Sequence, residues 1–161
     1  MQYLIDGHNL IPHFRGLSLS DPDDEEALLE LLSRFQRVQR ASITVFFDGA
    51  PLGKHGTRRY GSVNAVFVPA NKTADQAIAE TLARHKAAAK NIVLVSSDRQ
   101  VQATGRERRS TVMQSSKFAR LVLNAIQSAD AQSGEIEASS ADEIEEWLRI
   151  FSDPKNKKTS S

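Results

Sequence analysis

Three short apolar segments, each leading into an aspartate, constrain the fold of this chain more than any other feature. They are Tyr3–Ile5 before Asp6, Ile43–Phe47 before Asp48, and Asn91–Val95 before Ser96-Ser97-Asp98. Short continuous apolar runs are typical of strands that are buried on both faces of a parallel sheet. The carboxyl ends of parallel strands lie at one edge of the sheet, so we expect these aspartates to lie near one another there.

Helical patterns separate the apolar segments. Helices are predicted over residues 22–40, from Thr73 to about Lys86, after Asp98 to about Gly105, from Ser115 or Ser116, and from Ser140 onward. The helix after Thr73 begins with a capping-box pattern, a threonine followed three residues later by Gln76. Val63 to Val68 predicts a further strand and Ser110–Met113 a brief edge strand, whereas residues 50–62 and 128–139 read as a loop and a polar connection. This alternation predicts an α/β fold with a mostly parallel central sheet and helices on both faces.

Length and composition narrow the class of protein. The 161 residues suit one domain over residues 1–151, followed by a polar tail over residues 152–161. The absence of cysteine excludes disulfides, a thiolate nucleophile and a cysteine-ligated metal, and it fits a cytoplasmic location. No apolar run approaches the roughly 18 residues of a membrane span, so no membrane partner is expected.

Four carboxylates are predicted at the carboxyl edge of the sheet. Asp75 joins Asp6, Asp48 and Asp98 because it lies in the first turn of the helix after a strand. Each one alone has an ordinary explanation, since an aspartate after a strand often caps a turn and Asp75 can favour the helix dipole. Together they would repel one another unless a hard cation such as Mg²⁺ or Mn²⁺ were bound. Such a cluster is typical of metal-assisted phosphodiester hydrolysis.

Four motifs in the same order resemble the YacP-like NYN domain family of the PIN-like nuclease superfamily. They are YLIDGHNLI, VFFDG, TADQAIAE and VLVSSDRQVQ, and the resemblance runs from about residue 2 to about residue 126. It implies a PIN-like three-layer fold and a metal-dependent endoribonuclease. It also implies single-stranded mRNA as the partner, with a ribosomal context as one role known in the family.

The resemblance also implies roles for individual residues. Asp6, Asp75 and Asp98 correspond to the acidic catalytic site of the family, with Asn9 as a companion polar residue and Asp48 as a further acid at the rim. Gly7 is expected to let the backbone turn away from the strand. His8 is expected to be a loop side chain, or one that contacts the metal ligands, rather than a metal ligand itself.

Basic residues near the acidic edge are the candidates for RNA binding. They are Lys54, Arg58 and Arg59 in the predicted loop, and Arg99, Arg106, Arg108 and Arg109 after the third aspartate. We expect these side chains to contact the RNA backbone and Tyr60 to stack on an unstacked base. The simpler explanation for the pairs Arg58-Arg59 and Arg108-Arg109 is that they are ordinary solvent-exposed surface residues.

Two other function classes compete with a nuclease. A phosphotransferase or phosphatase with an aspartyl nucleophile usually needs a second acid two residues after the first, where this chain has His8. A non-catalytic RNA-binding or ribosome-binding module would keep the same fold. The intact acids argue against the second alternative, and an RNA cleavage assay with and without Mn²⁺ separates it from a nuclease.

Overall fold

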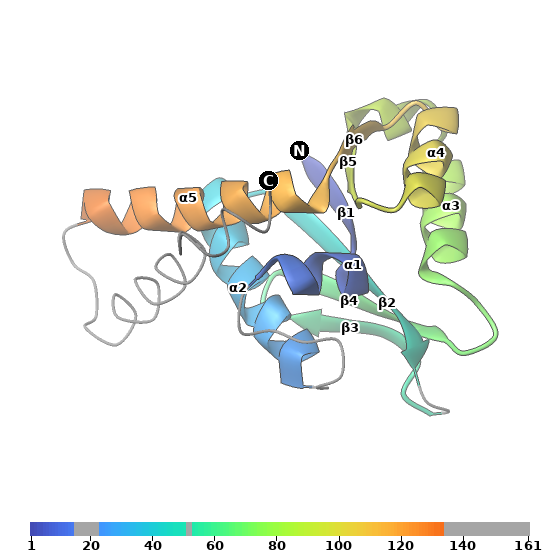
Figure 1. The fold of residues 1–161 in the computed structure, drawn as a ribbon, viewed down its shortest axis with the longest axis horizontal. Helices are drawn as coiled ribbons and strands as arrows, with labels where there is room; N and C mark the ends of the chain where they lie inside the picture. Colours follow the sequence, from blue (N-terminus) through green and yellow to red (C-terminus); the bar gives the residue numbers. More distant parts are fainter. Residues whose placement is uncertain (15–22, 51–52, 134–161) are drawn as a thin grey trace.

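The computed structural model describes residues 1–14, 23–50 and 53–133, which form a six-stranded sheet between two layers of helices (Figure 1). The strand order is β3-β4-β2-β1-β5-β6. The strands are β1 (Gln2–Asp6), β2 (Ser42–Ala50), β3 (Gly56–Tyr60), β4 (Val63–Pro69), β5 (Ile92–Val95) and β6 (Thr111–Met113). All neighbouring pairs are parallel except β3 and β4. The predicted α/β fold with a mostly parallel sheet is confirmed.

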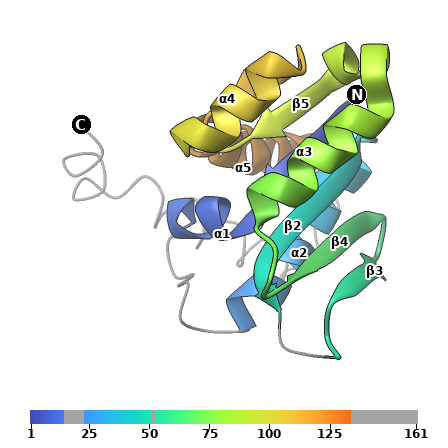
Figure 2. The same cartoon turned by 90° about the vertical axis from the view of Figure 1, so that its right-hand side faces the viewer.

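Helices cover both faces of the sheet (Figure 2). The helical segments are α1 (Gly7–Leu10), the 3-10 turn η1 (Ile11–His13), α2 (Asp23–Gln39), α3 (Ala74–His85), the 3-10 turn η2 (Lys86–Asn91), α4 (Arg99–Glu107) and α5 (Ser115–Ser133). Helices α1, α2 and α5 pack on one face, and α3 and α4 pack on the other. Within the described ranges, no helix combines the length and apolar character that a membrane span needs.

Each face of the sheet has its own hydrophobic core because side chains alternate along the strands. Tyr3 and Ile5 belong to the core beneath α2 and α5, whereas Leu4 belongs to the core beneath α3 and α4. The Tyr3 ring lies 6.0 Å from the Phe35 ring and 5.1 Å from the Phe118 ring, measured between centroids. This aromatic cluster fixes α2 and α5 against β1, and so fixes the strand that ends in Asp6.

Several boundaries differ from the sequence prediction. Residues 56–60 of the predicted loop form β3, which pairs with β4 in the antiparallel direction. Strand β2 continues past Phe47 to Ala50 after an irregularity in its register with β4, so Asp48 lies within the strand rather than after it. Helix α5 continues to Ser133, into the predicted polar connection. The predicted terminal helix from Ser140 and the polar tail lie outside the described residues.

Gly7 has a packing role rather than the predicted turning role. A Cβ atom on Gly7 would lie 2.4 Å from Cε1 of Phe47 and 2.9 Å from Cγ1 of Val45, and both of those side chains are buried. Its φ is not positive, so the backbone does not itself demand glycine. Glycine at this position lets α1 begin directly after Asp6 while lying against β2.

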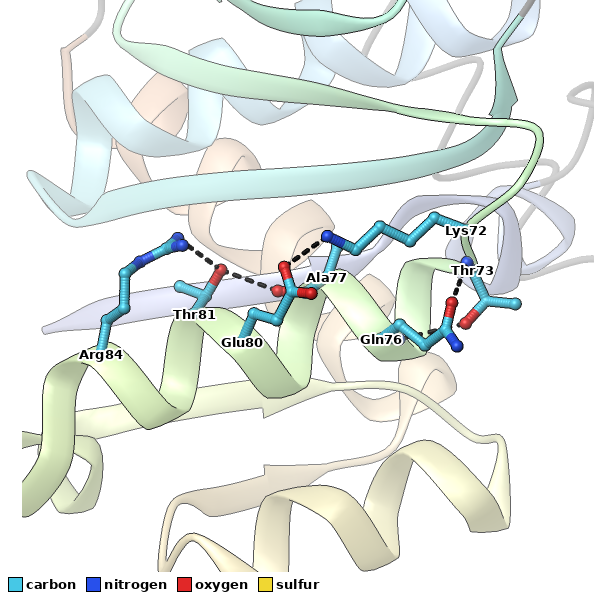
Figure 3. Close-up of polar contacts among 7 residues, drawn as sticks. All are labelled: Lys72, Thr73, Gln76, Ala77, Glu80, Thr81 and Arg84. Atoms are coloured by element: carbon cyan, nitrogen blue, oxygen red, sulfur yellow. Dashed lines mark hydrogen bonds and ion pairs between the residues drawn. The ribbon is translucent and has the colours of Figure 1, made fainter.

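The start of α3 is fixed by the predicted capping box (Figure 3). Thr73 Oγ1 accepts a hydrogen bond from the Gln76 backbone N–H at 3.1 Å, and Gln76 Oε1 accepts one from the Thr73 N–H at 2.9 Å. Lys72, which precedes α3, forms an ion pair with Glu80, which lies one turn after Gln76. These contacts define the first turn of α3, which holds Asp75.

Candidate active site

Asp6 is tied to the beginning of α4 through one serine. Asp6 is the last residue of β1, and its Oδ2 accepts a hydrogen bond from the hydroxyl of Ser96 at 3.2 Å. The same hydroxyl oxygen accepts a hydrogen bond from the backbone N–H of Asp98 at 3.1 Å. Because Ser96 is fully buried, it holds the two acidic residues in a fixed relation at the carboxyl ends of β1 and β5.

Asp98 caps α4 with one of its two carboxylate oxygens. Its Oδ1 accepts hydrogen bonds from the backbone N–H groups of Gln100 at 2.8 Å and Val101 at 3.4 Å. The ordinary capping explanation therefore applies to Oδ1. Within the described residues, Oδ2 accepts no hydrogen bond, so this oxygen remains available to another ligand.

Asn9 joins three segments that are distant in the sequence. Its Oδ1 accepts hydrogen bonds from the Ser97 backbone N–H and from the Ser115 hydroxyl, both at 2.7 Å. The Ser97 hydroxyl oxygen in turn accepts a hydrogen bond from the Ser115 N–H at 3.0 Å. Asn9 therefore holds α1, the β5–α4 turn and the start of α5 together beside Asp6. Local sequence signals place Ser97 after a strand and Ser115 at the start of a helix, but they do not show that both contact Asn9.

The environment of Asp6 favours its neutral form. Burial is the largest cause, and with the charges of Asp48 and Asp98 it raises the pKa of Asp6 to about 6, against the lowering effects of the Ser96 hydrogen bond and His8. Asp6, Asp48 and Asp98 therefore lie close enough to interact electrostatically. This edge of the sheet carries an excess of negative charge in the absence of a cation.

His8 bridges two carboxylates on different elements. Its Nδ1 lies 2.9 Å from Oδ1 of Asp48 on β2, and its Nε2 lies 2.6 Å from Oε2 of Glu25 on α2. Burial lowers the pKa of His8, but the hydrogen bonds and charges of the two acids outweigh it and raise the pKa above its usual value. Only a protonated imidazole donates from both nitrogens. The prediction missed Glu25 because nothing in a helix sequence shows which of several neighbouring acids faces a distant histidine.

Asp75 has a buried carboxylate oxygen without a partner. Its Oδ1 is inaccessible to solvent and accepts no hydrogen bond from the part of the chain that the structure describes. The pKa of Asp6 responds to the charges of Asp48, Asp98 and His8, and Asp75 is not among its causes. Among the described residues, no three acidic or imidazole side chains form a compact group ready for a metal. The sharing of one ion by Asp6, Asp75 and Asp98 stays a prediction.

The donor set nevertheless suits a hard cation. Mg²⁺ or Mn²⁺ would provide a partner for the buried, unpartnered oxygen on Asp75 and would offset the repulsion that Asp48 and Asp98 exert on Asp6. The free oxygen of Asp98 adds a third oxygen ligand at the same edge.

The predicted RNA-binding residues fall into two separate groups. Lys54, Arg58, Arg59 and Tyr60 line a pocket of about 590 Å³ that also includes Asp48. The second group comprises Arg99, Arg106, Arg108 and Arg109, which are exposed on α4 and in the turn before β6. Since β3 and β6 are the two outer strands of the sheet, the structure places the two basic groups toward opposite edges.

A mostly parallel sheet with acids at its carboxyl edge is the framework that the sequence motifs led us to expect, and the family comparison agrees. The sequence model of the YacP-like NYN domain family matches residues 3–156, so the chain belongs to that family. The family is of the PIN-like nuclease kind, which supports a nuclease-type function directed at RNA.

Solved structures share the fold. Rae1 (YacP) from Bacillus subtilis superposes with a TM-score of 0.66 at 19% sequence identity, covering 100% of this chain and 98% of that chain. A point mutant of the same protein gives a TM-score of 0.69 at 19% identity, covering 98% of this chain and 96% of that chain. No curated protein sequence matches this chain. At this identity the likeness describes the fold rather than the details of the site.

Proposed function

We propose that this protein is a divalent-metal-dependent endoribonuclease that hydrolyses phosphodiester bonds of single-stranded mRNA, in the cytoplasm and in a ribosomal context. The observation that carries the proposal is the unbalanced negative charge at the carboxyl edge. Asp6 has a pKa of about 6 because it is buried beside Asp48 and Asp98. Family membership supports the same class of chemistry.

Asp6, Asp75 and Asp98 would hold the metal, and Asp48 would complete the site from its rim. When bound, Mg²⁺ or Mn²⁺ supplies an activated water and stabilises charge on the phosphate oxygens. The chain itself contributes position: Ser96 fixes Asp6 relative to Asp98, and Asn9 fixes the turn that carries Asp98. Asp6, Asp75, Asp98 and Asn9 are the proposed catalytic set.

The basic residues would offset the repulsion between RNA and the acidic edge. Phosphates and the carboxylates share a sign, so nearby cations are needed for RNA to approach. Lys54, Arg58 and Arg59 line the same pocket as Asp48. We extend the proposal to Arg99, Arg106, Arg108 and Arg109 as a second contact with the RNA backbone. A single domain over residues 1–151 with a tail over residues 152–161 is part of the same proposal.

An RNA cleavage assay tests this function. Purified protein should cut single-stranded RNA internally when Mn²⁺ or Mg²⁺ is present and should stop when the ions are chelated by EDTA. Asp75→Asn should remove cleavage, whereas Glu107→Gln should not, because Glu107 is exposed at the end of α4. RNA binding without cleavage at any metal concentration would instead favour a non-catalytic RNA-binding or ribosome-binding module.

A further inference from the structure

The pocket beside Asp48 has two walls of opposite charge. One wall is formed by Glu25 and Glu26 on α2, and the other by the basic residues Lys54, Arg58 and Arg59 before and on β3. Ala65 and Phe67 of β4 also line the pocket and are apolar. The volume of about 590 Å³ lies in the range of small-molecule sites and exceeds that of one nucleobase.

The two walls do not neutralise each other. Within the described residues, no ion pair crosses the pocket from Glu25 or Glu26 to Lys54, Arg58 or Arg59. Arg58 instead places its guanidinium over the Phe67 ring, with Cζ 5.4 Å from the ring centroid. Opposite charges that line an open pocket without pairing are available to a ligand with donors on one side and acceptors on the other.

The acidic wall has one fixed member and one available member. Glu25 is held by His8 through Oε2 at 2.6 Å. Glu26 is exposed and forms no ion pair within the described part of the chain. A carboxylate adjacent to an RNA path repels phosphates, so its contribution to RNA binding has to come from accepting hydrogen bonds from a base.

Guanine is the base whose hydrogen-bonding groups fit both walls. Its Watson–Crick edge carries two neighbouring N–H donors, the imino group and the exocyclic amine, which match a carboxylate. Its adjacent Hoogsteen edge carries the acceptors O6 and N7, for which arginine and lysine are the common partners. Adenine and cytosine each offer only one amino donor, and uracil offers one imino donor flanked by carbonyls.

We propose that this pocket binds a guanine base of the RNA, read by Glu26 on one edge and by Arg58 or Lys54 on the other. Because Phe47 stacks on the Phe67 ring and the Arg58 guanidinium covers it, the base is held by hydrogen bonds to its edges rather than by stacking on Phe67. Asp48 lines the pocket and also interacts with Asp6, so the guanosine lies next to the phosphodiester bond that is cut. This inference rests on the proposed function and specifies its substrate.

The test measures binding rather than cleavage. Short oligouridylates of one length carry a single central guanosine, inosine, adenosine or cytidine, and their affinities are measured by fluorescence anisotropy with the Asp6→Asn protein in EDTA. The guanosine RNA should bind on the order of tenfold more tightly than the adenosine RNA, the usual scale of a bidentate base contact. Inosine lacks only the exocyclic amine, so the inosine RNA should lose most of that advantage.

Substitutions then test whether Glu26 is the residue that distinguishes guanosine from inosine. Glu26→Gln in the same background should abolish the preference for guanosine over inosine. Glu30→Gln, one turn further along α2 and outside the pocket, should keep it. Equal binding of all four RNAs, or a preference that survives Glu26→Gln, overturns the inference.

The result also separates this inference from the proposed function. Metal-dependent cleavage by the parent protein without any guanosine preference would overturn only the pocket assignment. A guanosine preference without cleavage at any metal concentration would overturn the nuclease proposal and leave the pocket as a binding site.

Discussion

The two halves of the carboxyl edge hold their polar side chains in different ways. On the β1–β5 half, hydrogen bonds with serines hold Asp6 and Asn9, backbone N–H groups hold the Asp98 carboxylate, and Ser96 and Ser115 are fully buried. On the β2–β3 half, His8 bridges the acids Asp48 and Glu25, and the basic residues lie exposed around an open pocket.

This difference suits the β1–β5 half to the cleavage chemistry and the β2–β3 half to RNA binding. A buried, hydrogen-bonded network keeps carboxylate oxygens in one geometry, which metal-dependent chemistry requires. Exposed basic side chains without an ion pair can adapt to a nucleic acid backbone. We therefore expect changes in the first half to act on cleavage and changes in the second half to act on RNA binding.

The largest expected effect is that of Asp6→Asn on cleavage. Losing a partner that only orients a ligand typically lowers activity about 10–100-fold, so losing the central carboxylate itself should lower cleavage by more than about 100-fold. RNA binding should remain near the parental value because Asp6 does not line the pocket that holds Lys54, Arg58 and Arg59. Cleavage rates and anisotropy titrations measured on the same protein check both statements. If Asp6→Asn weakened RNA binding as much as cleavage, the two halves of the edge would not have separate roles.

Metal should stabilise the folded chain. A ligand that binds only the native state raises the free energy of unfolding by about 2.7 kcal/mol at a hundredfold excess over its dissociation constant. Melting curves recorded with EDTA and with increasing Mn²⁺ should therefore shift upward. Asp6→Asn or Asp75→Asn should reduce the shift and can stabilise the metal-free protein by relieving repulsion. A melting temperature indifferent to millimolar Mn²⁺ would argue against the metal site.

Asn9→Ala should have an intermediate effect on both stability and cleavage. It removes the acceptor for the Ser97 N–H and the Ser115 hydroxyl, and leaving such groups unpaired costs about 1–3 kcal/mol. Because the turn that carries Asp98 loses its support, cleavage should fall by about tenfold. Asn71→Ala is the matched control, since Asn71 is exposed in the turn before α3. Parental cleavage by folded Asn9→Ala protein would show that the network is not needed.

The basic residues should change the salt dependence of RNA binding. Each phosphate contact contributes roughly −0.7 to the slope of log affinity against log salt for single strands. Replacing Lys54, Arg58 and Arg59 together by alanine should make that slope shallower and weaken binding, while the metal-dependent melting shift stays intact. The same replacement of Arg106 and Arg108 should have the smaller effect. If replacing Arg106 and Arg108 weakened RNA binding more than replacing Lys54, Arg58 and Arg59, the RNA would instead bind along the β6 edge of the sheet.

The smallest expected effect is that of pH on cleavage. With a pKa of about 6, Asp6 is about half ionised at pH 6 and about nine-tenths ionised at pH 7, so cleavage should rise roughly twofold over that interval.

Stability without metal should change in the opposite direction. A raised carboxyl pKa means that the native state binds the proton more tightly than the unfolded chain does. The metal-free protein should lose stability as the pH rises from about 4 to 6, and Asp6→Asn should lack this part of the dependence. Unfolding titrations at several pH values check the sign, and stability that rises over this window only in the parent would contradict it.

The sheet and its acidic edge could be predicted because they follow from local signals. An apolar run that stops at an acid marks both a buried strand and its carboxyl end, and parallel pairing then brings Asp6 and Asp98 to one edge. The capping box predicted the start of α3 for a similarly local reason.

Strand β3 and Glu25 could not be predicted because both depend on distant partners. Residues 56–60 contain a glycine and two arginines without apolar alternation, and they form a strand only because β4 offers an edge with which to pair. Glu25 is one of several acids in the first turns of α2, and only the packing of that helix shows that it faces His8. Nor did the sequence show that Asp75 would hold a buried, unpaired oxygen.

The most direct test of the account is to locate the metal. Crystals grown or soaked with Mn²⁺ and measured for anomalous scattering at the manganese edge would show where the ion binds. We predict an anomalous peak at the carboxyl edge, contacted by Asp6 and Asp98 and by the Asp75 oxygen that is unpaired without it. A peak elsewhere, or no peak at millimolar Mn²⁺ with Asp75 still unpaired, would contradict the proposal that this edge is a metal-dependent catalytic site.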